Sequence, residues 1–218
     1  MSNYTNRVKY PRTFHFDNSP GLQNDDRRLQ TLDGFYKNGL RISPKQVVAT
    51  LKMDGENTTM YSDHIHARSL DSPGHSSRNI VKAIHGRIKH EIPDGYRICG
   101  ENLYAKHSIY YQDLVSYFQV FNVWDHDWCL DWEETKEICE LLGLHMVQVI
   151  YEGPFDLEAI HNAYLPYAEQ HEGYVVRVRD KFHIDKFSTH VGKYVRKDHV
   201  QTSTHWLREQ IVPNQLGE

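Results

Sequence analysis

Apolar residues recur along this chain at two spacings, one typical of helices and one typical of strands. After the acidic pair Asp25 and Asp26 the spacing is helical, which predicts a helix ending near residues 38–39. Helical spacing also predicts a helix from Ser76 or Ser77 to a stop at Pro93, one from Asp131 to Gly143, and one over 157–169. Short β-prone runs predict strands over residues 46–52, 57–61, 96–103, 117–124, 146–151, 173–179 and 181–187.

The order of these elements indicates the fold class. Asp54 and Gly55 separate two β-prone runs, which is a strong hairpin signal and places Lys52 at a strand end beside a tight turn. Hairpins without strict strand–helix–strand alternation predict an α+β fold with mainly antiparallel sheets flanked by helices. Residues 1–24 show no periodicity and are expected to wrap the surface. The chain contains no repeat, low-complexity tract or flexible linker, so a single domain over residues 1–218 is expected.

Length and composition exclude several classes of protein. The chain has 218 residues, of which 39% are hydrophobic, enough for a sizeable core. No apolar run approaches the ~20 residues that a membrane-spanning helix needs, and the N-terminus lacks the apolar stretch of a signal peptide. A soluble, intracellular, cytoplasmic protein without membrane contact is expected. The three cysteines have no paired spacing, and free buried thiols are expected.

Charge is unevenly distributed along the chain, although the formal net charge is only -4. Residues 1–112 carry 16 basic and 11 acidic residues, and residues 177–208 carry 8 and 3. Residues 113–176 carry 1 basic and 13 acidic residues. If the two basic segments meet in space, the protein has a cationic face suited to a polyanion despite its overall sign.

Five short segments place charged or aromatic residues at the ends of predicted strands. They are Lys52-Met-Asp-Gly-Glu-Asn57, Gly100-Glu-Asn-Leu-Tyr104, Phe118-Gln-Val-Phe121, Glu172-Gly-Tyr-Val-Val-Arg177 and Lys193-Tyr-Val-Arg-Lys197. Each segment by itself is also explained as a strand with a charged end, and the first as an ordinary turn. Their occurrence together in this order carries the signal.

In these segments the chain resembles the RNA ligases of the covalent nucleotidyltransferase superfamily, which also contains ATP-dependent DNA ligases and messenger-RNA capping enzymes. The five segments match motifs I, III, IIIa, IV and V, and Arg68 stands at the motif Ia arginine. The resemblance runs from about residue 46 to 200 and extends to a segment around His199 and His205. It implies a nucleotidyltransferase domain, the ATP-grasp-like catalytic domain of such ligases. The residues after motif V are too few for the OB-fold of many relatives, so no appended OB-fold is expected.

The resemblance implies ATP-dependent RNA ligation. Lys52 would attack the α-phosphate of ATP, form lysyl-AMP, pass AMP to an RNA 5′-phosphate and allow sealing to a 3′-OH. Attack requires a neutral amine, which nearby cations such as Lys193 and Mg²⁺ would favour. The expected catalytic residues are Lys52, Lys193 and Glu172; the expected nucleotide-binding residues add Asp54, Gly55, Asn57, Arg68, Glu101 and Phe121, with Phe121 stacked on adenine.

The expected metal is Mg²⁺ or Mn²⁺, bound by Asp54, Glu101 and Glu172 mainly through water. Motif V departs from the family pattern because its second lysine position is Val195, so Arg196 or Lys197 is the expected second cation.

Several alternatives stay open at this stage. A DNA ligase or a capping-type nucleotidyltransferase would share these motifs, and an inactive nucleotide- or RNA-binding module would share the fold. A partner protein or chain that supplies further nucleic-acid binding is compatible with so short a chain. A zinc site at His64 and His66 is disfavoured because no third ligand has supporting spacing.

Overall fold

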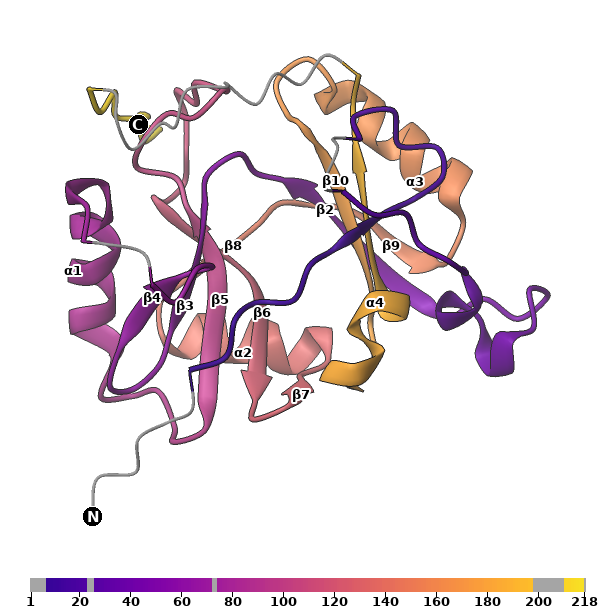
Figure 1. Cartoon of the computed structure of the whole chain (residues 1–218), viewed down its shortest axis with the longest axis horizontal. Helices are drawn as coiled ribbons and strands as arrows, with labels where there is room; N and C mark the ends of the chain where they lie inside the picture. The colour runs from indigo at the N-terminus through magenta and orange to yellow at the C-terminus, as the bar shows by residue number, and fades with distance from the viewer. Residues whose placement is uncertain (1–6, 23–25, 72–73, 198–209, 218) are drawn as a thin grey trace.

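Two mainly antiparallel sheets face each other in the computed structural model, which describes residues 7–22, 26–71, 74–197 and 210–217 (Figure 1). The five-stranded sheet has the order β1 (Phe14–His15), β12 (Val191–Val195), β10 (Gly173–Val178), β2 (Gln46–Lys52) and β9 (Val149–Pro154). The seven-stranded sheet has the order β11 (Phe182–His183), β7 (Trp128–Cys129), β6 (Phe118–Asp125), β5 (Tyr96–Asn102), β3 (Glu56–Met60) and β4 (Ile65–Ala67), with β8 (His145–Met146) paired to β6.

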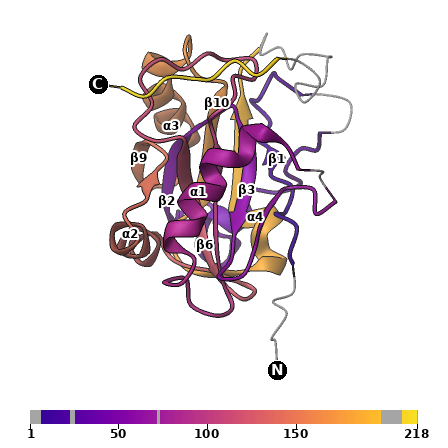
Figure 2. The same ribbon diagram turned by 90° about the vertical axis from the view of Figure 1, so that its left-hand side faces the viewer.

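Helices cover the outer faces of the two sheets. α1 (Asn79–Ile88) and α3 (Leu157–Tyr164) lie on opposite sides of the molecule with both sheets between them, and α2 (Trp132–Leu141) lies near β6 (Figures 1 and 2). The remaining helical elements are α4 (Phe187–His190) and the 3₁₀ turns η1 (Asp33–Phe35), η2 (Lys37–Gly39), η3 (Ser76–Arg78), η4 (Leu165–Tyr167) and η5 (Ile184–Lys186). The predicted α+β class with mainly antiparallel sheets is confirmed.

Elements with strong local signals form where the sequence predicts them. The side chain of Asp131 accepts the backbone N–H of Glu134, and the side chain of Glu134 accepts the backbone N–H of Asp131, which completes the predicted capping box at the start of α2. α1 follows η3 and buries Val81 and Ile88, as its apolar spacing indicates. β5 and β6 also lie in the predicted segments.

The predicted hairpin at Asp54 and Gly55 is wrong, although both of its strands exist. β2 pairs with β10 and β9 in one sheet, whereas β3 pairs with β4 and β5 in the other. The peptide between β2 and β3 therefore crosses from sheet to sheet. Both edges of β2 are occupied, one by β10 and the other by β9, so no edge of β2 is left for β3 to pair with.

The predicted helix over residues 25–39 is also wrong. Leu29 donates its backbone N–H to the carbonyl of His15, so this part of the chain pairs with the N-terminal segment. Only the short turns η1 and η2 form further on. The predicted strands over 181–187 and 146–151 differ as well, since the first gives way to η5 and α4 and the second is divided between β8 and β9 in different sheets.

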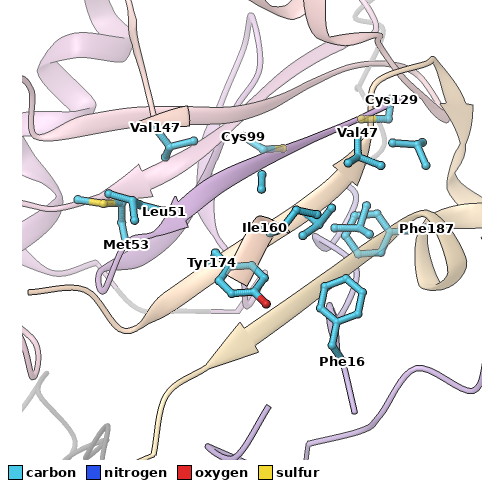
Figure 3. Close-up of a cluster of buried hydrophobic side chains, with 14 of the residues drawn as sticks. Phe16, Val47, Leu51, Met53, Cys99, Cys129, Val147, Ile160, Tyr174 and Phe187 are labelled. Carbon is cyan, nitrogen blue, oxygen red and sulfur yellow. The ribbon is translucent and has the colours of Figure 1, made fainter. Parts of the chain in front are cut away.

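The larger apolar core extends from α3, which contributes Ile160, through the five-stranded sheet to the other sheet (Figure 3). It joins Val47 and Leu51 of β2 to Cys99 of β5 and to Tyr174 of β10. A smaller core beneath α1 and α2 contains Val81, Ile98, Val120, Leu130 and Cys139. The N-terminal segment enters the larger core through Tyr10 and Phe16, which are buried, so it does more than wrap the surface. The three cysteines are free and buried, as predicted.

Candidate active site

A pocket of about 300 Å³ opens where the two sheets come together. Both sheets and the N-terminal segment supply its walls. Six of the residues predicted from the sequence line this pocket: Lys52, Asn57, Arg68, Glu101, Phe121 and Lys193. Asp54, Gly55 and Glu172 are not among its lining residues. The fold thus gathers residues that are up to 141 positions apart in the sequence (52 to 193) into one cavity.

Lys52 lies at the end of β2, where the chain leaves one sheet for the other. Its Nζ is 2.5 Å from Oε1 of Glu172, which is buried and directly precedes β10. The register of β10 on β2 brings this carboxylate to the lysine, because Gly173 is the residue opposite Lys52. A Cβ at Gly173 would overlap the carbonyl of Tyr194, so glycine permits the close approach of β10 and β12.

Carboxylates determine the charge of Lys52 in this structure. Burial opposes the ammonium form, but the attraction of Glu172, Glu101 and Asp54 outweighs burial and raises the pKa of Lys52 above the ordinary lysine value. The expectation that the site favours the neutral amine is therefore not met by the protein alone. Burial raises the pKa of Glu101 to about 8, and the nearby carboxylates Glu172 and Asp54 act in the same direction.

Lys193, on β12, is the second lysine of the pocket. Its Nζ is 3.1 Å from Oδ1 of Asp26, and burial together with repulsion from Lys52 lowers the pKa of Lys193. The predicted second cation is placed elsewhere, since Nε of Arg196 donates to the carbonyl of His171. Neither Arg196 nor Lys197 lines the pocket; its other cations are Arg12, Arg68 and Arg177.

Aromatic and amide groups line another part of the pocket. The ring of Phe121 packs edge-on against Tyr10, with 5.2 Å between ring centroids. Asn122 donates from Nδ2 to the hydroxyl of Tyr10 at 2.5 Å and accepts at Oδ1 from Nη1 of Arg177 at 2.7 Å. Arg177 also donates to the carbonyl of Leu130. A rigid aromatic wall beside fixed polar groups suits a planar base.

Asp54 holds a neighbouring loop. Its Oδ2 accepts hydrogen bonds from the backbone N–H groups of Ser108 and Ile109 and from the hydroxyl of Ser108, at 2.6–2.9 Å. Its own backbone N–H donates to the hydroxyl of Tyr111. Gly55 lies close to the backbone of Asn102, where a Cβ would not fit.

The C-terminal segment 210–217 fixes the same loop from the other side. Asn214 is buried, donates from Nδ2 to the carbonyl of Leu103 at 2.8 Å and accepts at Oδ1 from the N–H of Tyr111 at 2.9 Å. Main-chain bonds add to this contact, including one from the N–H of Lys106 to the carbonyl of Val212. The loop behind Lys52 is therefore tied to both motif I and the C-terminal segment.

The uneven distribution of charge along the sequence is also seen in the residues that line the pocket. All five of its cationic residues come from the two basic segments, and the acidic segment 113–176 contributes only uncharged residues to the lining. Glu172, the acidic-segment residue that reaches the site, meets Lys52 directly. Lys52, Arg68 and Lys193 line the same pocket.

A divalent cation fits the charge of this site but not a closed cage of protein ligands. Within the described part of the chain, no three His, Cys, Asp or Glu side chains converge as a metal site, and this includes His64 and His66. Glu172 nevertheless contacts Lys52 directly, and Glu101 and Asp54 lie near enough to raise the pKa of Lys52, so carboxylate oxygens are available beside the ammonium. Such a set suits Mg²⁺ that keeps most of its water, with Glu101 and Glu172 as the residues to hold it.

Sequence reasoning missed several pocket residues. Tyr10 and Arg12 lie in the segment expected to wrap the surface, and Asp26 was assigned to the start of a helix that does not form. Arg177 closes the fourth motif segment and could have been inferred, because it stands at a strand position between two buried valines. The segment around His199 and His205 lies outside the described residues.

Comparisons with known proteins identify the fold and the family. An archaeal ATP-dependent RNA ligase, form 1, superposes with a TM-score of 0.51 at 18% sequence identity, over 86% of this chain and 48% of the ligase. A candidate ATP-dependent DNA ligase from Aquifex aeolicus superposes with a TM-score of 0.54 at 20% identity, over 86% of this chain and 49% of the other. At these identities the likeness shows a shared fold.

The chain spans about half the length of these solved structures. A comparison with curated protein sequences found no match. No helix in the described ranges is long and apolar enough to cross a membrane. The family model for RNA ligase matches residues 45–195, which contain four of the motif segments, the first residues of the fifth and most of the pocket, and on this match the chain belongs to the RNA ligase family.

Proposed function

We propose that this protein is an ATP-dependent RNA ligase in which Lys52 carries AMP as a covalent intermediate. The observation that carries the proposal is the position of Lys52 at the wall of a pocket, with Glu172 at 2.5 Å and with Lys193 in the same lining. This arrangement supplies a nucleophile, a proton acceptor and a phosphate-binding cation for one reaction.

The first step joins AMP to the protein. The amine of Lys52 attacks the α-phosphorus of ATP, an N–P bond forms, and the bond to the β-phosphate breaks as pyrophosphate leaves. The ammonium must first lose a proton, and Oε1 of Glu172 lies at hydrogen-bond distance to accept it. Lys193 and Arg68 line the pocket as cations for the phosphates.

The nucleoside occupies the remainder of the pocket. Phe121 offers an aromatic surface for adenine, next to Asn122 and Tyr10. Oδ1 of Asn57 is buried and has no hydrogen-bond partner among the described residues, so a ribose hydroxyl or water would satisfy it. Mg²⁺ held by Glu101 and Glu172 would supply charge neutralisation at the phosphates.

In the later steps AMP passes to the nucleic acid. A 5′-phosphate oxygen attacks the phosphorus of lysyl-AMP and releases Lys52, and a 3′-OH then attacks the activated end and releases AMP. The RNA ligase family match favours RNA as this polymer. The described fold is shared with ligases named for RNA and for DNA, so a DNA ligase is the second candidate.

Transfer of label from protein to polymer tests the proposal. Wild-type protein incubated with α-labelled ATP and Mg²⁺ is expected to become labelled, and the label is expected to move to 5′-phosphorylated RNA. RNA with a 5′-OH is the matched control, because it lacks the attacking phosphate. Preferential transfer to matched DNA ends would favour a DNA ligase, labelling by GTP in place of ATP would favour a capping-type enzyme, and no labelling by either would favour a binding module.

A further inference from the structure

Lys193 makes polar contacts with residues that lie outside the five motif segments. β1 lies parallel to β12, and His15 is the residue directly opposite Lys193. Asp26 reaches both residues, with Oδ1 at 3.1 Å from Nζ of Lys193 and Oδ2 at 3.1 Å from Nε2 of His15. Oδ1 thus accepts a hydrogen bond from the ammonium of Lys193, while Oδ2 lies at ion-pair distance from the imidazole of His15.

His15 is completely buried, and its surroundings fix its orientation. Its Nδ1 is 2.7 Å from the hydroxyl of Ser19. That hydroxyl accepts the backbone N–H of Val195 at 2.9 Å and lies 3.3 Å from the carbonyl of the same residue. Because the Asp26 carboxylate can only accept, the tautomer that suits both contacts has the ring proton on Nε2, facing Asp26, and Nδ1 facing the Ser19 hydroxyl.

The backbone holds both side chains in place. The N–H of His15 donates to the carbonyl of Arg27, and the N–H of Leu29 donates to the carbonyl of His15, so residues 27–29 are paired to β1 next to Asp26. A side chain at Gly192 would overlap Phe16 and Leu29, which shows how closely this layer covers β12. The relative positions of His15, Asp26 and Lys193 are therefore set by main-chain contacts.

We propose that Asp26, oriented by His15, is a positioning residue that aims the ammonium of Lys193 at the α-phosphate. This inference rests on the proposed function. The structure gives each pocket lysine a different carboxylate, Glu172 for Lys52 and Asp26 for Lys193, at 2.5 and 3.1 Å. Asp26 also favours the charged form of Lys193, which burial and Lys52 oppose. The proposed nucleophile Lys52 and the proposed phosphate-binding cation Lys193 are thereby positioned by different carboxylates.

Substitutions that keep the size of these side chains test the proposal. The rate of protein adenylylation is measured at saturating ATP, together with the ATP concentration that gives half the maximal rate. Asp26→Asn is expected to lower the maximal rate at least about tenfold, because small displacements of a positioned group are costly. The half-saturating ATP concentration is expected to change less than about threefold if the effect falls on the transition state. Asp26→Glu, which restores the charge, should recover part of the rate.

Two further variants and a control separate positioning from stability. His15→Gln keeps an N–H donor for Asp26 and should react faster than His15→Leu, with thermal unfolding showing that both are folded. Asp17→Asn removes an exposed acid of the same segment and should react like wild type. If folded Asp26→Asn reacts as fast as wild type, the proposal is overturned. If Asp26→Asn does not fold, equal rates for the two His15 variants overturn it.

The proposed function fails independently of this inference. Absence of labelling in wild-type protein contradicts the lysyl-AMP proposal. Labelling of wild type and Asp26→Asn at equal rates contradicts only the role of Asp26.

Discussion

Removal of the Asn214 side chain tests how the C-terminal segment supports the site. Asn214→Ala deletes the hydrogen bond from Nδ2 to Leu103 at 2.8 Å, a longer one to Ala105 at 3.4 Å, and the bond that Oδ1 accepts from Tyr111 at 2.9 Å. It leaves the two main-chain bonds of residue 214 with Tyr104 and Tyr117 in place.

The magnitude follows from burial. Asn214 is 1% exposed, so the N–H of Tyr111 and the carbonyl of Leu103 would lose their partner without gaining water. Each unsatisfied buried group costs about 1–3 kcal/mol, and the loss for Asn214→Ala is expected to be about 2–4 kcal/mol. Gln215→Ala is the matched control: Gln215 is exposed and bonds Tyr111 and Leu114 through its main chain, so less than about 0.5 kcal/mol is expected.

Urea unfolding and the adenylylation assay together decide the result. The variant is expected to unfold at lower urea, and its adenylylation rate should fall even where it is fully folded, because the loop with Ser108 and Ile109 holds Asp54. An Asn214→Ala protein as stable as wild type would refute the account of the loop. Reduced stability with an unchanged adenylylation rate would show that the segment supports the fold but not the site.

Three further predictions test other parts of the structure. Gly173→Ala should destabilise the protein by about 1–3 kcal/mol, because the added Cβ would overlap the backbone of Tyr194. Gly86→Ala, at an exposed position of α1, should instead stabilise it by about 0.5–1 kcal/mol. Urea unfolding measures both free energies, and equal effects of the two substitutions would contradict the packing of β10 on β12. Burial, aided by repulsion from Lys193, lowers the pKa of His15 to about 4. Between about pH 6.5 and pH 4 the unfolded chain therefore binds a proton at His15 that the folded protein does not bind. The free energy of unfolding should fall by up to ~3 kcal/mol as the pH drops through this range. His15→Gln should lose that part of the pH dependence, and an unchanged slope would count against a buried neutral imidazole. Phe121→Ala should raise the half-saturating ATP concentration about 10- to 100-fold if the ring stacks on adenine, and an unchanged value would exclude that contact.

Local signals in the sequence predict a large part of this fold. The capping box at Asp131 and Glu134, the apolar spacing of α1 and the β-prone runs of β2 and β5 depend on residues close in sequence, and these elements form as expected. The pairing of strands depends on distant residues. Asp54 and Gly55 look like a hairpin turn by composition, but β2 is enclosed by β9 and β10, so the chain must cross to the other sheet.

Some residues of the candidate site could also be predicted from local sequence, whereas others depend on contacts between distant parts of the chain. Lys52, Glu101, Phe121 and Lys193 belong to recognisable segments, and the structure brings them to one pocket. Asp26 could not be inferred, because an acid before an apolar helical pattern resembles a helix N-terminus. Its partners His15 and Lys193 become neighbours only when β1 pairs with β12. The charge of Lys52 depends likewise on three carboxylates that meet only in the folded chain.

Intact-protein and peptide mass spectrometry after incubation with ATP and Mg²⁺ tests the central claim most directly. Wild-type protein is expected to gain the mass of one AMP, on the peptide that contains Lys52, and to lose it on addition of pyrophosphate. Lys52→Arg keeps the positive charge beside Glu172 and is expected to gain no adduct. An AMP adduct on another residue, or an adduct that persists in Lys52→Arg, would contradict the assignment of Lys52 as the nucleophile.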